Sequence, residues 1–370
     1  MEWQLIESDA DLQAALAAVA GSSVVAVDTE FMRTNTFYPK VALVQLCFGD
    51  RALLVDPLAI TDTTPLAELL TDPKLVKVLH SASEDLEVFQ RWLGVLPEPL
   101  FDTQRATALL DMGFGLGYSG LVKLICDVDL PKGETRSDWL QRPLTDSQCE
   151  YAAQDVAWLL PVWRHLEDKC EAQQKDGWVL ADGRDAVATF RASSYDFTKR
   201  IKTAWKLDKR ALGRLVAVCN WREEMARSRN KPRGWIIDDQ ACLQLAQNDP
   251  QSMEELKSRV ELPHSVQRRH GEDLLKVLAA QREVPEAELP ARLPGLLDAA
   301  QRRQLKDMKA QVRAIAAELG CAPEALLQGK DYELLLREFH GEAVEQPLHW
   351  QGWRLDLVLA PLRASLGGAG

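Results

Sequence analysis

The sequence predicts a mixed α/β sheet flanked by helices, followed by a helical C-terminal part. Three apolar segments, residues 24–27, 41–48 and 52–55, have the β-branched and aliphatic composition of adjacent strands. Helical and strand-like segments alternate after them, which is typical of an α/β domain. The last third is helical and contains positions that recur at one common offset. We therefore expect an α/β domain followed by two small helical domains.

Length and composition limit the class of protein. The 370 residues are too many for one ordinary core, and 46% hydrophobic with 27% charged residues is typical of a soluble globular chain. The net charge of −11 argues against a surface covered in positive charge, although a local basic patch could still bind nucleic acid. Seven cysteines without C-x-x-C spacing predict reduced thiols. The acidic first twenty residues and the lack of a long apolar run predict a cytoplasmic protein without a membrane segment.

The first elements follow from local patterns. An amphipathic helix is expected within the first twenty residues. The Gly-Asp pair at 49–50 predicts a hairpin turn between the second and third apolar segments. A strand at 75–79 then leads into His80 and two serines that are suited to cap the next helix.

The rest of the α/β part is marked by breakers and caps. A short strand at 100–103 and a helix at 105–111 precede a glycine-rich loop at 113–120, whose spacing does not match a phosphate-binding motif. Thr145 and Gln148 form a capping box that begins the next helix. A proline at position 161 is expected to kink that helix.

Basic residues concentrate after residue 177, with tryptophans among them. A solvated helical surface would account for them, but clustered cations mixed with aromatic rings also suit a phosphate backbone with stackable bases. We favour nucleic-acid binding. The residues of this tract predicted to contact RNA are Lys199, Arg200, Lys202, Lys206, Arg210 and Arg222.

The helical part contains an internal repeat with an offset of 91 residues. The offset relates Arg222, Ala226, Pro232, Leu243 and Leu245 to Arg313, Ala317, Pro323, Leu334 and Leu336. A proline-rich stretch at 285–294 is a plausible joint between the two copies. The expected domains are therefore residues 1–195, 196–289 and 290–370.

Four carboxylates are candidates for one site. Asp28 and Glu30 follow a buried strand two residues apart, so their side chains leave the same face. Alone, this pair fits a solvated strand end, but Asp85 at a helix start and Asp155 on a helix face can reach the same edge of the sheet. Four carboxylates in one pocket require cations, and such a pocket is what a two-metal phosphodiester hydrolase needs.

Three segments together resemble the exonuclease motifs of the DEDD superfamily: Val-Asp-Thr-Glu-Phe at 27–31, His-Ser-Ala-Ser-Glu-Asp at 80–85 and Tyr-Ala-Ala-Gln-Asp at 151–155. Tyr151 marks the tyrosine subtype, because the histidine subtype would carry His where Glu150 stands. The wider context at 28–33, 38–39, 56–58 and 137–144 is similar to the ribonuclease D family. The helical copies resemble the HRDC domains that follow the nuclease in that family.

The resemblance implies a ribonuclease H-like exonuclease domain with two HRDC-like domains. It implies 3′→5′ trimming of RNA, notably of tRNA precursors, with release of nucleoside 5′-monophosphates. Asp28, Glu30 and Asp155 are then expected to hold one Mg²⁺ or Mn²⁺, and Asp28 and Asp85 a second. Tyr151 would orient or deprotonate the attacking water, and orientation is the more conservative role because an unperturbed phenol has a pKa of about 10. His80 would contact phosphate or serve a structural role.

Other functions remain open from the sequence. A DNA 3′→5′ exonuclease would carry the same motifs, because discrimination of the sugar depends on contacts to the 2′-hydroxyl that spacing does not reveal. A catalytically inactive RNA-binding scaffold would be expected to lack one of the carboxylates, and all four are present. A structural helical adaptor would leave them unexplained. The sequence gives no sign of an obligate protein partner.

Overall fold

A computed structural model describes residues 2–131, 133–192 and 200–367 of the chain. Its contacts divide the chain into two compact units. The first unit combines residues Met1–Met32, Pro39–Ser193 and Asp298–Gly370, and the second combines Arg33–Tyr38 with Ser194–Leu297. Lys199, one of the residues predicted to bind RNA, lies outside the described residues.

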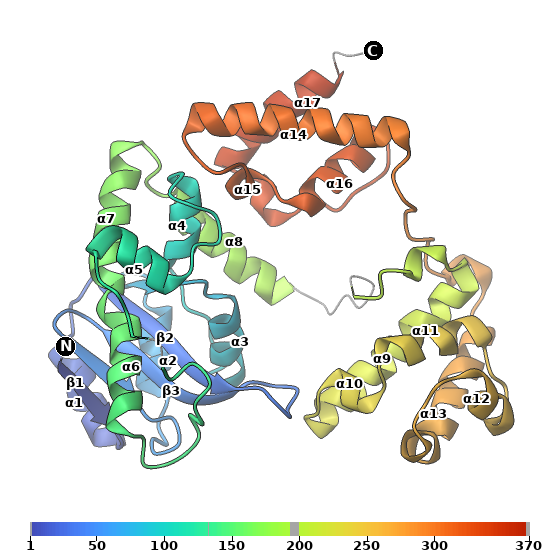
Figure 1. The fold of residues 1–370 in the computed structure, drawn as a ribbon, viewed down its shortest axis with the longest axis horizontal. Helices are drawn as coiled ribbons and strands as arrows, with labels where there is room; N and C mark the ends of the chain where they lie inside the picture. Colours follow the sequence, from blue (N-terminus) through green and yellow to red (C-terminus); the bar gives the residue numbers. More distant parts are fainter. Residues whose placement is uncertain (1, 132, 193–199, 368–370) are drawn as a thin grey trace. The chain divides into compact units, whose positions relative to one another are not determined.

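The first unit contains a mixed sheet of six strands in the order β1-β4-β3-β2-β5-β6 (Figure 1). The strands are β1 (Glu2–Ile6), β2 (Val24–Met32), β3 (Lys40–Cys47), β4 (Arg51–Val55), β5 (Val76–Leu79) and β6 (Leu100–Asp102). The pairs β2–β3 and β3–β4 are antiparallel, and the other three pairs are parallel. This confirms the predicted mixed sheet. The sequence analysis missed β1, a short edge strand that pairs only with β4.

Helices cover both faces of the sheet (Figure 1). The core of one face is filled from α1 (Asp9–Ala18), α2 (Thr64–Thr71) and α3 (Ser83–Trp92). The core of the other face is filled from α4 (Thr103–Leu109), α5 (Tyr118–Cys126), α6 (Asp146–Ala157), α7 (Leu159–Ala172) and the start of α8 (Trp178–Ala192). Because side chains alternate along β2, Val25 and Val27 face the first core, and Ala26 faces the second.

The predicted serine cap of α3 is wrong, because the N-cap is Ala82 and no side chain makes a cap hydrogen bond there. Thr145 and Gln148 form the expected capping box at the start of α6. The helical run is interrupted at Trp158, where α6 ends and α7 begins. Pro161 lacks the N–H that would bond the carbonyl of Ala157, which accounts for the break.

The two helical copies share one sequence of elements. The first has α9 (Lys209–Arg229), α10 (Arg233–Ile236), α11 (Asp239–Asn248), α12 (Met253–Arg259) and α13 (His264–Arg282). The second has α14 (Ala299–Leu319), α15 (Pro323–Leu326), α16 (Gly329–Phe339), the π-helical segment Leu355–Leu359 and α17 (Ala360–Gly367). Short 3₁₀ turns occupy Ala204–Lys206, Glu286–Glu288 and Leu348–Trp350.

The repeat is real, but its offset is 90 residues and the predicted offset of 91 is wrong. Helices α9 and α14 each have 21 residues, and each ends at a left-handed residue, Asn230 or Gly320. Arg222 therefore corresponds to the buried Val312, and Ala226 to the buried Ala316. Matching identical residues misaligned the copies because buried position, and not residue identity, is what the two copies share.

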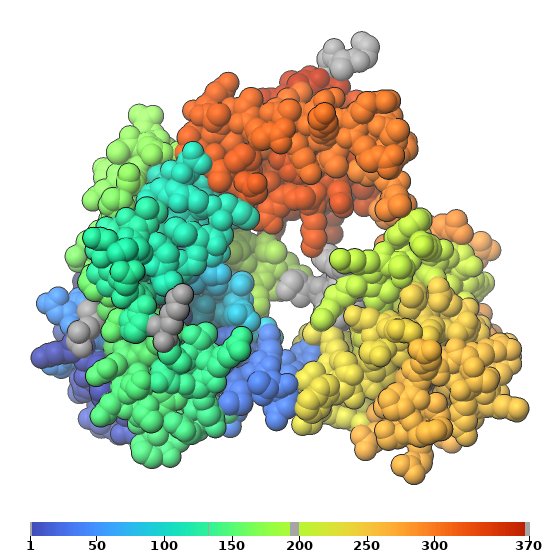
Figure 2. Space-filling view, in the orientation of Figure 1, coloured from blue at the N-terminus to red at the C-terminus, as the bar shows by residue number. Residues whose placement is uncertain are grey.

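The second copy packs on the α/β part within the first unit, as the adjoining orange and teal regions of Figure 2 show. The N–H of Ala322 donates to the carbonyl of Ala108 at 2.8 Å, and the Trp178 and Trp353 rings stack with centroids 4.0 Å apart. The Lys175 ammonium donates to the carbonyl of Leu109 in the α/β part and to the carbonyl of Gly320 in the second helical copy. The three-domain division at 195 and 289 remains a prediction about sequence units.

No helix among the described residues combines the length and apolar character that a membrane span requires.

Residues 33–38, between β2 and β3, belong to the second unit. There Phe37 packs against Ala226 and Ile236. The side-chain oxygen of Asn230, the left-handed residue that ends α9, accepts the N–H groups of Phe37 and Tyr38. The connection between two strands of the sheet is thus built into the core of the first helical copy.

Candidate active site

The strand β2 places Asp28 and Glu30 on the sheet face that α6 covers. In the β2–β3 register Asp28 lies directly opposite Gln45, and Glu30 lies opposite Leu43. Both carboxylates are partly buried, because α6 packs on β2 and β3 (Figure 1). The predicted pairing of the two carboxylates on one face agrees with this register.

Asp85 reaches the site from the first turn of α3, where it is buried. Its carboxylate accepts a hydrogen bond of 2.5 Å from the hydroxyl of Thr29. Thr29 stands between Asp28 and Glu30 and points to the other face of the sheet, so this bond ties α3 to β2. The sequence analysis did not predict this contact, because it joins residues 56 positions apart.

Helix α6 supplies Tyr151 and Asp155, one helical turn apart. The Tyr151 hydroxyl lies 3.3 Å from the hydroxyl of Thr135, and its ring lies 6.1 Å from the ring of Trp139. The α6 capping box at Thr145 fixes where the helix starts and therefore which face carries these two side chains.

The four carboxylates act on one another electrostatically. Burial raises the pKa of Asp28 well above its ordinary value, and the charges of the other three carboxylates raise it further. Burial, followed by the charges of Asp155 and Asp85, raises the pKa of Glu30 to about 9. Burial also raises the pKa of Asp85 and that of Asp155 to about 7 each. The four groups therefore form one cluster, as the sequence predicted.

This cluster suits hard divalent cations. Carboxylate oxygens are the ligands that Mg²⁺ and Mn²⁺ prefer. No lysine, arginine or histidine of the described chain lowers the pKa of any of the four carboxylates, so their charge is left for an outside cation to balance. Among the described residues, no three His, Cys, Asp or Glu side chains are placed so that they could hold a metal ion as they stand.

Two tyrosines lie within the field of these carboxylates. Burial, with the charges of Asp155, Glu30 and Asp28, raises the pKa of Tyr151 above its ordinary value. Burial, with the charges of Asp155 and Asp28, raises the pKa of Tyr118 well above its ordinary value. Both phenols therefore stay protonated near neutral pH. The sequence analysis missed Tyr118 because it treated the glycine-rich segment around it as a loop.

His80 lies beside the cluster and is held by local contacts. Its Nδ1 lies 2.9 Å from the Thr103 hydroxyl, which donates to the carbonyl of Leu79, so Nδ1 carries the proton. Its ring centroid lies 5.7 Å from that of Tyr118. Its Nε2 is buried and has no hydrogen-bond partner among the described residues. Burial lowers the pKa of His80, so the ring is neutral near pH 7.

The predicted RNA-binding residues of the basic tract differ in accessibility. Arg200, Lys202 and Lys206 are exposed, and Lys206 lies over the ring of Trp205 at 5.5 Å. Arg210 is exposed but donates to the carbonyl of Val284 at 2.6 Å.

Arg222 differs from the rest of the tract because its side chain is buried, with 1% exposure. It donates to Asp239 at 2.8 Å and to the carbonyl of Ile237 at 3.2 Å. Its guanidinium therefore cannot contact a ligand in this fold, which corrects its assignment to the RNA-binding set.

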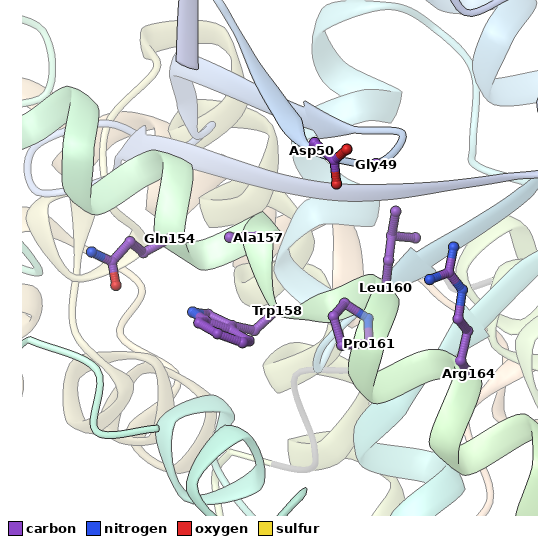
Figure 3. Close-up of a pocket in the computed structure, with 8 residues that line it drawn as sticks. All are labelled: Gly49, Asp50, Gln154, Ala157, Trp158, Leu160, Pro161 and Arg164. Atoms are coloured by element: carbon purple, nitrogen blue, oxygen red, sulfur yellow. The ribbon is translucent and has the colours of Figure 1, made fainter. Parts of the chain in front are cut away.

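Two hollows in the first unit lie apart from the carboxylates. One, of about 420 Å³, is lined by Gln154 and Trp158, by Arg164 of α7 and by Asp50 of the β3–β4 turn (Figure 3). The other, of about 490 Å³, is lined by residues of α3, α4 and α8 and by the exposed Phe114. None of the four carboxylates lines either hollow.

Comparisons with known proteins decide the family. A family model described as a 3′-5′ exonuclease matches residues 3–171, and an HRDC domain model matches residues 211–278. Ribonuclease D of Pseudomonas paraeruginosa is 42% identical over 372 residues, covering 100% of this chain and 98% of the relative. The chain belongs to the ribonuclease D family. Ribonuclease D of Escherichia coli K12 is 36% identical and covers 98% of both chains.

The fold agrees with this family. The crystal structure of E. coli RNase D, an exoribonuclease involved in structured RNA processing, superposes with a TM-score of 0.92. It is 34% identical, and the match covers 100% of both chains. The chain is therefore a ribonuclease D-type 3′→5′ exoribonuclease of the DEDD superfamily, which confirms the predicted family, fold class and enzyme class. The inactive scaffold and the DNA exonuclease are not supported.

Proposed function

We propose that this chain trims the 3′ ends of tRNA precursors with two bound Mg²⁺ or Mn²⁺ ions and releases nucleoside 5′-monophosphates. The observation that carries the proposal is the group of four interacting carboxylates, whose pKa values no cationic side chain of the described residues lowers. Like charges so close together are unfavourable unless a cation lies between them. The cluster therefore has the charge and the oxygen donors of a two-ion site.

Each side chain has a distinct part in the proposed site. Asp28, Glu30 and Asp155 would hold one ion, and Asp28 and Asp85 the other. When bound, the ions would supply the charge that activates the attacking water and stabilises the leaving 3′ oxygen. The Thr29 hydroxyl restricts how Asp85 can turn, because it donates to one oxygen of that carboxylate.

Tyr151 is proposed to orient the attacking water. Its raised pKa keeps the hydroxyl protonated, so it can donate or accept a hydrogen bond but is poorly suited to take up a proton. We propose a structural role for His80, because the Thr103 hydroxyl holds its neutral ring through Nδ1 and its buried Nε2 has no proton to donate to a phosphate.

The second unit is proposed to bind the body of the RNA. Arg200, Lys202 and Lys206 are exposed, and Lys206 lies beside Trp205, which gives a charged and aromatic surface for backbone and bases. Arg210 could add to this surface if it released the carbonyl of Val284. The HRDC match over 211–278 and the structured RNA named for the E. coli relative support this role.

The test uses the full chain with RNA labelled at either end and with DNA of the same sequence. We expect 3′ label to leave at once as a mononucleotide, 5′-labelled RNA to shorten stepwise, and both reactions to stop in EDTA. A tRNA precursor with a 3′ extension should be trimmed. Asp28→Ala should abolish cleavage, and Asp50→Ala, which removes an exposed carboxylate of the Figure 3 hollow, should not. Cleavage in EDTA, internal cuts or near-full activity of Asp28→Ala would contradict the proposal.

A further inference from the structure

A buried polar side chain next to the carboxylates has no assigned function. Gln45 on β3 is 0% exposed, yet neither its amide nitrogen nor its amide oxygen has a hydrogen-bond partner among the described residues. Most buried side-chain amides in proteins are hydrogen-bonded, because an unpaired donor or acceptor in an apolar interior is costly. A fully buried glutamine with both groups unpaired therefore calls for a reason.

The sheet register shows what Gln45 can reach. Gln45 lies directly opposite Asp28 in the antiparallel pair β2–β3 and opposite Leu54 in the pair β3–β4. Residues directly opposite each other point to the same face, with Cβ atoms roughly 4.5–5.5 Å apart. The amide nitrogen of Gln45 lies three bonds beyond its Cβ, so the side chain is long enough to span the distance to the Asp28 carboxylate.

The strand neighbours of Gln45 on this face are apolar or thiol side chains. Cys47 and Leu43 follow and precede Gln45 on the same face of β3, and Leu54 and Ala52 lie beside it on β4. Helix α6 covers this area with Cys149, Ala152, Ala153 and Val156. Asp28 is the charged side chain that the register places next to the amide.

We propose that Gln45 is a positioning residue that donates a hydrogen bond from its amide nitrogen to the Asp28 carboxylate when divalent ions are bound. The bond would hold one oxygen of Asp28 and direct the other towards the ions that Asp28 shares. Partners of this kind orient ligands and strengthen metal binding in other proteins. The inference rests on the proposed metal site, and it adds a residue that none of the exonuclease motifs contains.

The test compares Gln45→Met with the unaltered full chain. Methionine keeps the length and apolar packing of the side chain but removes both hydrogen-bonding groups. Leu54→Met is the matched control, because it alters packing on the same face without removing a polar group. Mn²⁺ binding is measured by isothermal titration without RNA, and the melting temperature of each variant is measured in EDTA.

We expect Gln45→Met to bind Mn²⁺ roughly 10-fold to 100-fold more weakly, as for other outer-shell partners. Its melting temperature in EDTA should be unchanged or higher, because the amide has no partner in the metal-free fold. Cleavage of a short RNA should need more Mn²⁺ for half-maximal rate, with the KM for RNA unchanged at saturating metal. Leu54→Met should behave as the unaltered chain in Mn²⁺ binding.

Unchanged Mn²⁺ affinity in Gln45→Met, with a normal titration of the unaltered chain, would overturn the inference and leave the proposed metal site intact. A lower melting temperature in EDTA would also overturn it, because the amide would then be shown to stabilise the metal-free fold. Absence of Mn²⁺ binding by the unaltered chain would contradict both the inference and the proposed function.

Discussion

Two groups of buried charge in the first unit differ in how the charge is balanced. Asp182 and Arg354 are both almost fully buried and form two hydrogen bonds of 2.6 and 2.8 Å, and Arg105 adds a third ion-pair contact at 2.8 Å. The carboxylates around Asp28 are also placed within reach of one another's charge, but no cationic side chain of the described residues lowers their pKa. In the first group the chain supplies both charges. In the second it supplies one sign only.

This difference indicates that the Asp182–Arg354 pair has a structural role, whereas the carboxylates around Asp28 are candidates for binding a cation. The Asp182–Arg354 pair joins α8 of the α/β part to the second helical copy, so its balanced charge serves the packing of one compact unit. Breaking one half of such a pair leaves the other charge buried and unpaired. We expect the carboxylate cluster to lower the stability of the metal-free protein, because burial and like charges disfavour its ionised forms.

The largest expected effect comes from removing one carboxylate from each group. Asp28→Asn should lower the rate of RNA cleavage by more than roughly 100-fold, because it removes a proposed metal ligand and not only a residue that orients one. It should not lower the stability of the metal-free protein. Asp182→Asn should lower the free energy of unfolding by about 3–5 kcal/mol, because it leaves Arg354 without its counter-charge. Urea unfolding measures the stability of each variant, and an RNA cleavage assay measures its activity. The comparison fails if Asp28→Asn destabilises the fold as much as Asp182→Asn does.

A smaller effect is expected for the tyrosine at the edge of the cluster. Tyr151→Phe keeps the ring and removes the hydroxyl, so turnover should fall by roughly 100-fold with the KM for RNA unchanged. The structural Tyr332→Phe, in the second helical copy, is the control and should leave turnover unchanged. A higher KM with normal turnover would instead assign Tyr151 to substrate binding.

The same distinction applies to the cations of the second unit. Arg222 is paired with Asp239 and buried, whereas Lys202 and Lys206 are exposed and have no ion pair within the described chain. Replacing both lysines with glutamine should weaken tRNA-precursor binding. It should also reduce the slope of log affinity against log salt by roughly 0.7–0.9 for each lost phosphate contact.

Lys276→Gln, an exposed lysine paired with Asp273, is the control for this measurement. Filter binding at several salt concentrations provides the slopes. Equal slopes for the double variant and the unaltered chain would show that these lysines are only a solvated surface.

The last expected effect is a pH dependence of the metal-free stability. Folding raises the pKa of Glu30 from 4.5 to about 9. Between these values the unfolded chain has lost a proton that the folded chain keeps, so stability falls as pH rises through this range. Glu30→Gln has no ionisable group at this position, so it removes this fall in stability. Its melting temperature in EDTA should therefore exceed that of the unaltered chain at pH 9 and nearly equal it at pH 5.

Glu150→Gln, which removes an exposed glutamate of α6, is the control and should show no such change between the two pH values. A gain of equal size at pH 5 and pH 9 would show that Glu30→Gln acts through packing and not through charge.

The parts of the site that the sequence predicted depend on short-range patterns. The two-residue period of β2 and the four-residue spacing of Tyr151 and Asp155 place side chains on faces before any packing is known. Contacts between distant residues were not predictable in this way. Asp182 and Arg354 are 172 positions apart, and nothing in either local sequence indicates that they meet.

Arg222 was misassigned for a related reason. A cation within a basic tract is expected to be solvated, but the partner that allows it to be buried, Asp239, begins the next long helix. The burial of an ionisable group depends on such a partner, and a partner from another element is known only once the helices are packed.

A crystal of the full chain soaked in Mn²⁺ tests directly whether the unbalanced carboxylates hold metal ions. Anomalous scattering should show two peaks roughly 3.5–4 Å apart. The peaks should lie among the oxygens of Asp28, Glu30, Asp85 and Asp155, with the Asp28 carboxylate in contact with both. A fully Mn²⁺-loaded crystal with no peak at these four side chains, or with a peak that does not contact Asp28, would contradict the account.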